Sequence, residues 1–228
     1  MAEMIQMDEK TWRVEDGFVR FFILAGKERA AMIDSGFACP NAKAIAEELT
    51  GLPVILLNTH GDGDHTSGTG AFAEIHMSRA DYECCGIAEK YPGTKLCAVG
   101  DGVKVSLGER TLEIIDIPGH TKGSIAILDV ERRMLYAGDS VQTGTIFMFG
   151  ASRTKEQYPL SLEKLVGLSD RYDSVVASHS EPVLQKEQVS KVLAAWKRVQ
   201  RGEVPFETVN MHGTEVKQYQ TADCGFYC

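Results

Sequence analysis

Short apolar runs rich in valine, isoleucine and phenylalanine recur along the chain, separated by polar segments. Runs of this length and composition are typical of buried β-strands. They occur at 18–24, 30–33, 54–57, 111–117, 125–130, 134–137 and 175–177. Polar turns at 107–112 and 130–134 join some of these runs as hairpins, so part of the sheet is expected to be antiparallel.

Helices are predicted between and after these strands, at about 41–49, 80–90, 160–168 and 185–201. The last segment has the clearest pattern, because its apolar residues form one stripe at helical spacing: Val189, Val192, Leu193, Trp196 and Val199. We interpret this stripe as a face that packs on the core. Strands and helices mixed in this way predict an α/β (α+β) fold in which helices cover sheets.

The chain has 228 residues, of which 43% are hydrophobic, and no repeat or linker divides it. We therefore expect one domain over 1–228, with the C-terminal helix at about 185–201 and the tail 202–228 packed on it. The formal charge of −8 has the wrong sign for binding nucleic acid.

Neither a secretory signal nor an apolar run of about 18 residues is visible, so we expect a cytoplasmic protein without a membrane partner. The six cysteines lack a regular framework spacing and are expected to be reduced thiols. The role of Cys224 and Cys228 and the oligomeric state stay open.

Polar residues that can bind metal follow four of the apolar runs. These residues are His60, His120, Asp139 and His179. Loops at the carboxyl ends of strands are where sheets present functional groups, so we expect these side chains to converge on one rim. Histidines and carboxylates that converge predict a metal site.

The segment 60–65 reads His-Gly-Asp-Gly-Asp-His, which places four potential ligands in six residues. Its two glycines let the backbone fold tightly around an ion. A single histidine is more often structural than ligating. Here, however, four of the six histidines lie at strand ends or in this one loop, which favours a ligand role.

With these elements the chain resembles the metallo-β-lactamase superfamily. The family signature is H-x-H-x-D-H, then P-G-H-T-x-G-S, then G-D, then a histidine after a short strand. The matching segments are 60–65, 118–124 (Pro-Gly-His-Thr-Lys-Gly-Ser), 138–139 and His179. The resemblance covers about residues 17–185. It implies an αββα sandwich of two mixed sheets flanked by helices, with the metal site at one edge.

The resemblance also implies a role for each ligand. His60, Asp62 and His120 would bind a first divalent ion, while Asp64, His65 and His179 would bind a second. Asp139 would bridge the two ions, which are expected to be zinc. A hydroxide held between them would be the nucleophile, and Asp64 would orient it as the catalytic residue. Asp34 is expected to support the site without binding metal.

Asp62 departs from the family pattern, because histidine usually occupies this position. Two imidazoles and one carboxylate suit iron or manganese as well as zinc, so we expect these metals to compete at the site formed by His60, Asp62 and His120. In an alternative interpretation Asp62 faces solvent and only the second site binds metal.

The segment after Asp139 supplies four candidates for substrate contact: Phe147, Phe149, Arg153 and Tyr158. The two phenylalanines form either a pocket wall or ordinary core contacts.

The first functional hypothesis is a dinuclear metal-dependent hydrolase that acts on a small ester, thioester, lactone, amide or phosphoester. A di-iron redox protein that reduces oxygen or nitric oxide with an external electron donor is the alternative, motivated by Asp62. A metal-stabilised binding module without turnover is a third. The segment after His179 is short for the helical substrate-binding domain of glyoxalase II, so hydroxyacylglutathione is not the favoured substrate.

Overall fold

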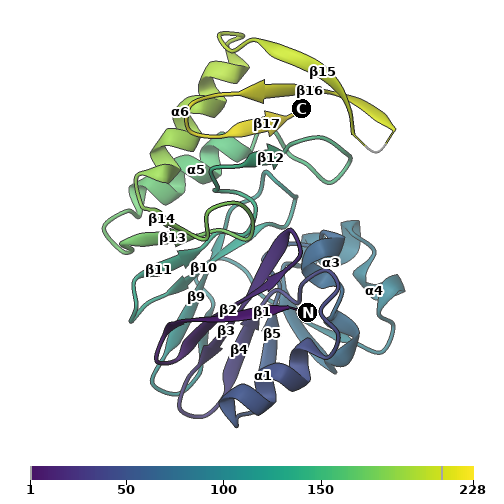
Figure 1. Cartoon of the computed structure of the whole chain (residues 1–228), viewed down its shortest axis with the longest axis vertical. Helices are drawn as coiled ribbons and strands as arrows, with labels where there is room; N and C mark the ends of the chain where they lie inside the picture. Colours follow the sequence, from purple (N-terminus) through teal and green to yellow (C-terminus); the bar gives the residue numbers. More distant parts are fainter. Residues whose placement is uncertain (1, 212) are drawn as a thin grey trace.

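Two β-sheets face each other in the computed structural model, which describes residues 2–211 and 213–228 (Figure 1). The first sheet has seven strands in sequential order: β1 (Glu3–Asp8), β2 (Thr11–Asp16), β3 (Val19–Ala25), β4 (Ala30–Ile33), β5 (Val54–Leu57), β6 (Glu74–Met77) and β7 (Lys95–Ala98). Neighbours are antiparallel from β1 to β4 and parallel from β4 to β7.

The second sheet has six strands in the order β14-β13-β11-β10-β9-β8. Their bounds are β8 (Lys104–Ser106), β9 (Thr111–Asp116), β10 (Ile125–Asp129), β11 (Met134–Tyr136), β13 (Ser174–Val176) and β14 (Val183–Gln185). Strands β11 and β13 are parallel, and every other pair is antiparallel. Both predicted hairpins, β8 with β9 and β10 with β11, are present.

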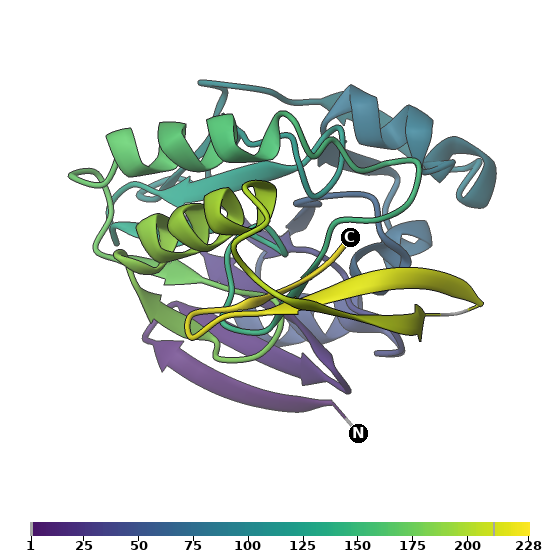
Figure 2. The same cartoon turned by 90° about the horizontal axis from the view of Figure 1, so that it is seen from above.

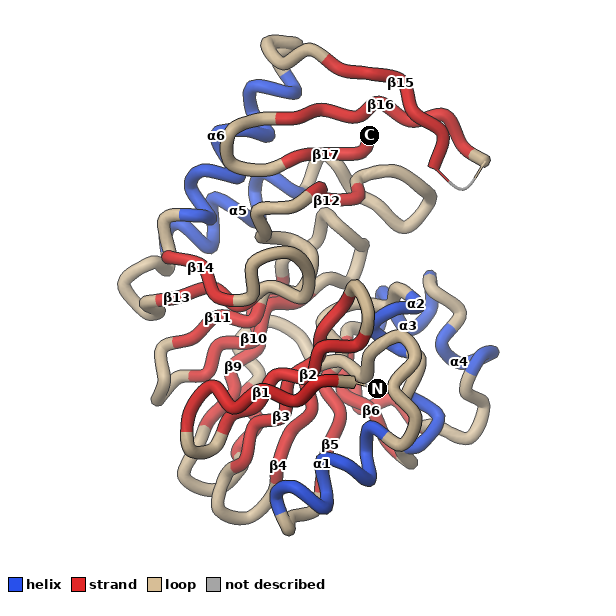
Figure 3. The backbone as a smooth tube through the Cα atoms, in the orientation of Figure 1, coloured by secondary structure: helices blue, strands red, loops and turns tan. Residues whose placement is uncertain are grey.

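Helices cover the outer faces of the two sheets (Figure 3). Those that follow strands of the first sheet are α1 (Ala42–Thr50), α2 (Gly63–Thr66), the 3₁₀ turn η1 (Thr69–Ala71), α3 (Arg79–Cys84) and α4 (Ile87–Lys90). The second sheet is covered by α5 (Tyr158–Gly167), which comes before β13 in the chain, and α6 (Gln188–Gln200), which follows β14. These two helices pack side by side in both views (Figures 1 and 2).

The alternation of side chains along each strand produces three layers of core. On β3, Phe22 and Leu24 pack between the two sheets, whereas Phe21 and Ile23 pack toward the helices of the first sheet. The predicted apolar stripe of α6 lies in the third layer, against the second sheet. The αββα sandwich is therefore confirmed.

A third sheet extends this sandwich and is formed largely by the C-terminal tail. Its order is β12 (Thr145–Phe147), β17 (Gly225–Tyr227), β16 (Thr214–Gln220) and β15 (Phe206–Met211). The tail packs on the second half of the sandwich, where the Phe226 ring lies 5.0 Å from that of Trp196. Cys224 is buried in the same layer, and all six cysteines are free thiols.

Two local predictions need correction. The helix predicted at 80–90 is two short helices, because Gly86 adopts a left-handed φ of +65° between α3 and α4. The tail 202–228, for which no strand is predicted, forms three strands. Its strand β15 has mostly exposed side chains, so the apolar run that marks a buried strand is missing.

Gly119, beside the predicted ligand His120, tests how tightly the loop after β9 packs on α5. A Cβ atom at this position would lie 2.7 Å from the Cα atom of Tyr158, which is backbone and cannot move aside cheaply. We expect Gly119→Ala to lower the free energy of unfolding by about 1–3 kcal/mol in urea denaturation. Gly167→Ala is the matched control, since a Cβ there meets open space, and equal effects of the two variants would contradict this packing.

Candidate metal centre

Four imidazole rings from three separate segments of the chain meet at one edge of the sandwich. His60 follows β5, His65 lies in α2, His120 follows β9 and His179 follows β13. The ring centroid of His60 lies 4.0 Å from that of His65 and 4.7 Å from that of His120, and His65 lies 5.5 Å from His179. The predicted convergence of these strand ends is therefore present in the structure.

An acceptor outside the cluster holds the Nδ1 atom of each ring. His120 Nδ1 donates to the backbone oxygen of Phe147 at 2.9 Å, and His179 Nδ1 donates to that of Phe18 at 2.7 Å. His65 Nδ1 lies 2.8 Å from an oxygen of Asp34. With Nδ1 engaged in this way, each ring directs Nε2 toward the centre of the cluster.

Asp34 orients two of the four rings. Its carboxylate also accepts from the backbone N–H of Thr59 at 2.7 Å and from the Thr59 hydroxyl at 2.8 Å. Because that hydroxyl donates to Asp34, it is free to accept from His60 Nδ1, which lies 3.0 Å away. Asp34 has a left-handed φ of +63°, an uncommon backbone conformation for an aspartate. The predicted supporting role of Asp34 agrees with these contacts.

Four of the atoms that face the centre have no hydrogen-bond partner among the described residues. Nε2 of His60, His65 and His120 and one oxygen of Asp139 are buried, and none of these atoms meets a hydrogen-bond partner among the described residues. Leaving such atoms unpaired is costly unless they bind something else. A positively charged ion that accepts several lone pairs would satisfy all of them together.

The spacing of the facing atoms fits a metal ion. Two ligands of one tetrahedral zinc ion, each about 2.0–2.2 Å from it, lie about 3.3–3.6 Å apart. The separations between Nε2 atoms and carboxylate oxygens in the cluster run from 3.2 to 3.8 Å. The residues present therefore fit a metal centre in both chemistry and spacing.

The carboxylates divide the cluster into two halves. Asp62 Oδ2 lies 3.3 Å from His120 Nε2 and 3.7 Å from His60 Nε2. Asp64 Oδ2 lies 3.4 Å from His179 Nε2 and 3.6 Å from His65 Nε2.

Asp139 lies between the two halves of the cluster. Its carboxylate lies 3.3 Å from His65 Nε2, 3.2 Å from His179 Nε2 and 3.8 Å from His120 Nε2. All seven predicted ligands are thus brought together, and Asp62 faces the cluster instead of solvent.

Burial and neighbouring charges shift the pKa values of the cluster in opposite directions. Burial lowers the pKa of His60, and the nearby His65 and His120 rings lower it further. Burial opposes the charged form of His65 too, but the carboxylates of Asp139 and Asp34 outweigh it and raise its pKa. For the same balance of reasons, with Asp139 the main partner, the pKa of His179 is raised to about 10.

Two charged residues outside the predicted set hold the ligand loops in place. The buried Asp81 accepts from the backbone N–H of Gly61 at 2.8 Å and from the Thr121 hydroxyl at 2.6 Å, so it connects the loops of His60 and His120. Arg20 donates to the backbone oxygens of Ala177 and Ser180, on either side of His179.

The sequence carries a signal for only one of these two residues. Arg20 is a charged residue inside an apolar strand pattern, which could have marked it. Asp81 resembles an ordinary residue in the first turn of a helix and carries no such signal.

The four substrate candidates differ in their surroundings. Tyr158 is a correction: it is fully buried and its hydroxyl donates to the backbone oxygen of Ser140 at 2.6 Å, so it offers no surface to a substrate. Arg153 is paired with Asp62. The rings of Phe147 and Phe149 are half-buried with centroids 5.7 Å apart, and their contact with substrate stays a prediction.

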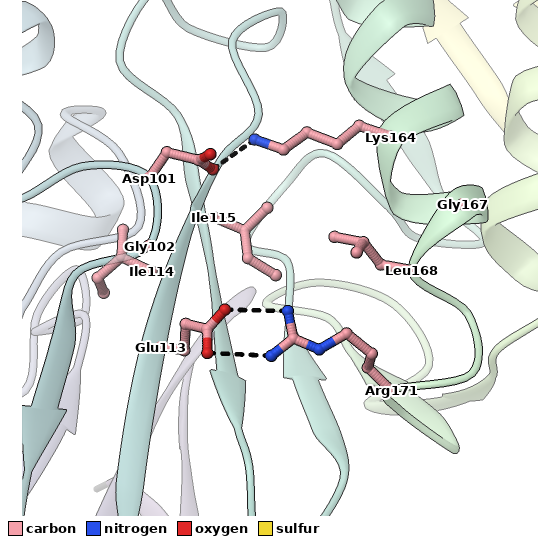
Figure 4. Close-up of a pocket in the computed structure, with 9 residues that line it drawn as sticks. All are labelled: Asp101, Gly102, Glu113, Ile114, Ile115, Lys164, Gly167, Leu168 and Arg171. Carbon is pink, nitrogen blue, oxygen red and sulfur yellow. Dashed lines mark hydrogen bonds and ion pairs between the residues drawn. The ribbon is translucent and has the colours of Figure 1, made fainter.

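A pocket of about 370 Å³ lies elsewhere on the second sheet, beside α5 (Figure 4). Two ion pairs cross it: Lys164 with Asp101, and Arg171 with Glu113 at 2.9 Å. None of its lining residues belongs to the histidine cluster. His212, for which no ligand role is predicted, lies outside the described residues. Within the described ranges, we find no helix that combines the length and the hydropathy needed to cross a membrane.

Comparisons with known proteins find a matching family model and similar sequences. The family model described as "Metallo-beta-lactamase superfamily" matches residues 14–80 and 90–188, a region that contains all seven predicted ligands. A hydroxyacylglutathione hydrolase of Pseudomonas putida is 30% identical over 175 residues, which cover 74% of this chain and 63% of the relative. The acyl-coenzyme A thioesterase MBLAC2 of Homo sapiens is 22% identical, with 66% of this chain and 68% of the relative covered.

Solved structures share the fold. A metallo-beta-lactamase from Pontibacter korlensis aligns with a TM-score of 0.73 at 19% identity, covering 86% of this chain and 99% of that one. Another from Hirschia baltica aligns with a TM-score of 0.65 at 13% identity, covering 85% and 96%. The chain thus spans nearly the whole length of these structures, but less than two thirds of the hydroxyacylglutathione hydrolase.

The raised pKa values of His65 and His179 predict proton release when zinc binds. The raised pKa values favour the protonated form of both rings in the metal-free protein, whereas a zinc ligand needs a neutral Nε2. We therefore expect protons to be released when zinc binds at pH 7, and the apparent zinc affinity to increase as the pH rises toward 10. Calorimetric titrations in buffers of different ionisation enthalpy measure this release, and a binding enthalpy independent of the buffer would contradict it.

Asp34→Asn tests whether the carboxylate behind the cluster orients His60 and His65. The amide keeps the size of the side chain but removes one acceptor oxygen, so we expect the zinc affinity to fall by about 10- to 100-fold. Competition with a chromophoric chelator measures this loss. Asp173→Asn, which changes an exposed carboxylate that pairs with Arg133, is the control. Equal affinities in the two variants would argue against the orienting role.

Proposed function

The chain belongs to the metallo-β-lactamase superfamily, and from that premise we propose that it is a dinuclear metal-dependent hydrolase. The observation that carries the proposal is that the buried Nε2 atoms of His60, His65 and His120 lack a hydrogen-bond partner among the described residues and lie 3.3–3.8 Å from carboxylate oxygens. Imidazole nitrogens and carboxylate oxygens gathered at this spacing suit a metal cation. Asp62 and Asp64 each lie near a different pair of histidines, so the cluster offers ligands for two ions.

The distances in the cluster support the two predicted ligand sets. His60, Asp62 and His120 would hold one ion, and Asp64, His65 and His179 the other. The first set gathers around Asp62 Oδ2 and the second around Asp64 Oδ2. Asp139 reaches atoms of both sets, which supports a bridging role. Zinc is our first choice for both ions, since imidazole and carboxylate ligands at these spacings suit it.

Ions bound here would supply a nucleophilic water at neutral pH and a Lewis acid for the carbonyl oxygen of the substrate. The protein's own residues position these groups. Asp64 is half-buried at the cluster, so we assign to its carboxylate the hydrogen bond that orients the attacking water. Asp34 and the backbone oxygens of Phe18 and Phe147 keep the imidazoles in place throughout.

We propose a thioester as the substrate. Two relatives are a hydroxyacylglutathione hydrolase and an acyl-coenzyme A thioesterase, and both of these names denote hydrolysis of a thioester bond. The half-buried rings of Phe147 and Phe149, on the segment whose backbone holds His120, are our candidates for contact with the acyl group.

A panel of substrates tests the proposed activity directly. We expect the zinc-loaded protein to hydrolyse thioesters such as S-lactoylglutathione or acetyl-coenzyme A. A chelator should abolish the reaction and added zinc should restore it. A chromogenic phosphodiester is the comparison substrate. Faster turnover of the phosphodiester than of every thioester would overturn the substrate class, and turnover unaffected by metal removal would overturn the mechanism.

Asp64→Asn tests the catalytic residue. The amide is uncharged and its oxygen is a weaker hydrogen-bond acceptor than a carboxylate oxygen, so it should hold the attacking water less well, and we expect kcat to fall by about 100-fold or more. Metal content must be measured in the same samples, and Asp173→Asn serves again as the control for loss of one carboxylate. A variant that holds both metals and turns over at the wild-type rate would show that Asp64 does not orient the nucleophile.

A further inference from the structure

Arg153 binds Asp62, the one ligand position at which the chain departs from its family. One guanidinium nitrogen lies 3.0 Å from Asp62 Oδ1, and the other lies 2.5 Å from Oδ2. This two-pronged contact is the strongest geometry available to an arginine and a carboxylate. The side chain of Arg153 is only 11% exposed, so solvent screens the pair weakly.

The rest of the guanidinium group is also engaged. Arg153 Nε donates to the backbone oxygen of Phe147 at 3.3 Å, and a terminal nitrogen donates to the Ser152 hydroxyl at 2.7 Å. The same Phe147 oxygen accepts from His120 Nδ1. One carbonyl therefore fixes both the ligand His120 and the arginine that holds Asp62, and little of Arg153 is left for a substrate.

Asp62 meets the cluster and the arginine at the same time. Its Oδ2 accepts from one arginine nitrogen and also lies within 3.7 Å of the Nε2 atoms of His60 and His120. Its Oδ1 accepts from the other arginine nitrogen. A carboxylate oxygen has two lone pairs, so Oδ2 can bind Arg153 with one and a metal ion with the other. The carboxylate would then act as a ligand through one oxygen, as a single imidazole nitrogen does.

We propose that Arg153 is a positioning residue of the metal centre: it holds Asp62 as a one-oxygen ligand and cancels the negative charge that this aspartate adds. The Asp62–Arg153 pair then takes the place of one neutral histidine. This inference rests on the proposed metal centre. It also revises the expectation for the metal, because a charge-compensated ligand that binds through one oxygen favours iron and manganese less than an unpaired carboxylate does. Asp62 then no longer motivates the redox alternative.

Competition between metals tests the charge and the one-oxygen geometry. In Arg153→Met, both oxygens of Asp62 become available and its charge is uncompensated, which suits ions that prefer oxygen ligands and higher coordination numbers. We expect the ratio of bound manganese to bound zinc, after anaerobic loading with an equal mixture, to rise about tenfold over the wild type. Arg153→Lys keeps the positive charge but cannot make the two-pronged contact, so we expect it to raise the manganese-to-zinc ratio less than Arg153→Met does.

Arg171→Met is the matched control for this experiment. Arg171 also makes a two-pronged pair, with Glu113 at 2.9 and 3.0 Å, but it lies at the pocket beside α5 (Figure 4). The variant removes the same charge from the same kind of contact and should leave the metal ratio unchanged. An equal rise in Arg171→Met and Arg153→Met would overturn the proposal.

A double substitution tests the same idea without reference to manganese. Asp62→His restores the family ligand but leaves Arg153 as an unpaired cation beside the ion, so we expect the zinc affinity of the weaker site to fall about 10- to 100-fold. Adding Arg153→Met should recover at least about tenfold of that loss. If Asp62→His does not fold, the manganese-to-zinc ratio of Arg153→Met still tests the proposal.

The outcomes separate this inference from the proposed function. A wild type that binds close to two zinc ions, together with rescue of Asp62→His by Arg153→Met, supports both. Two zinc ions in the wild type without any rescue, and with an unchanged metal ratio in Arg153→Met, overturn the role of Arg153 alone. A wild type that binds no zinc overturns the proposed metal centre, and the role of Arg153 with it.

Discussion

The structure depends on one constraint: four imidazole rings are fixed from behind at Nδ1, so that their Nε2 atoms have to face one another. Each outer acceptor comes from a different part of the chain, namely Asp34, Thr59 and the backbone oxygens of Phe18 and Phe147. Buried imidazole nitrogens that face one another need a binding partner, because leaving their lone pairs unsatisfied is costly. The two sheets supply the rigidity that keeps the rings together, and the loops supply the polar atoms.

Charge balance follows from the same arrangement. Three carboxylates, those of Asp62, Asp64 and Asp139, face the imidazoles. In the metal-free protein burial opposes the charged form of His179, but Asp139 and Asp64 outweigh it and raise the pKa of this ring to about 10, so a proton is favoured where a cation would otherwise bind. Arg153 offsets one of the three carboxylates. The centre therefore combines the ligand set of the family with an arginine that offsets the charge of its unusual aspartate, Asp62.

The apolar runs predicted the central strands of both sheets, because buried strands leave such runs. The αββα arrangement and the roles of the ligands came instead from the resemblance to a known family, since apolar runs alone do not fix how two sheets pack. The strands of the tail 202–228 were not predicted, because the strands of a half-exposed sheet carry no such apolar run. The pairing of Asp62 with Arg153 could not be predicted from the sequence, for a different reason. The two residues are 91 positions apart, and no periodicity links them. Arg153 was identified as a site residue, but for contact with substrate instead of with a ligand.

The central claim is that two metal ions lie between these imidazoles and carboxylates. Anomalous X-ray diffraction from crystals of the zinc-loaded protein, recorded on both sides of the zinc absorption edge, tests it most directly. The account predicts two anomalous peaks about 3.5–4 Å apart, one beside Asp62 and His120, the other beside Asp64 and His179, with Asp139 between them. A single peak, or peaks remote from these side chains, would contradict it.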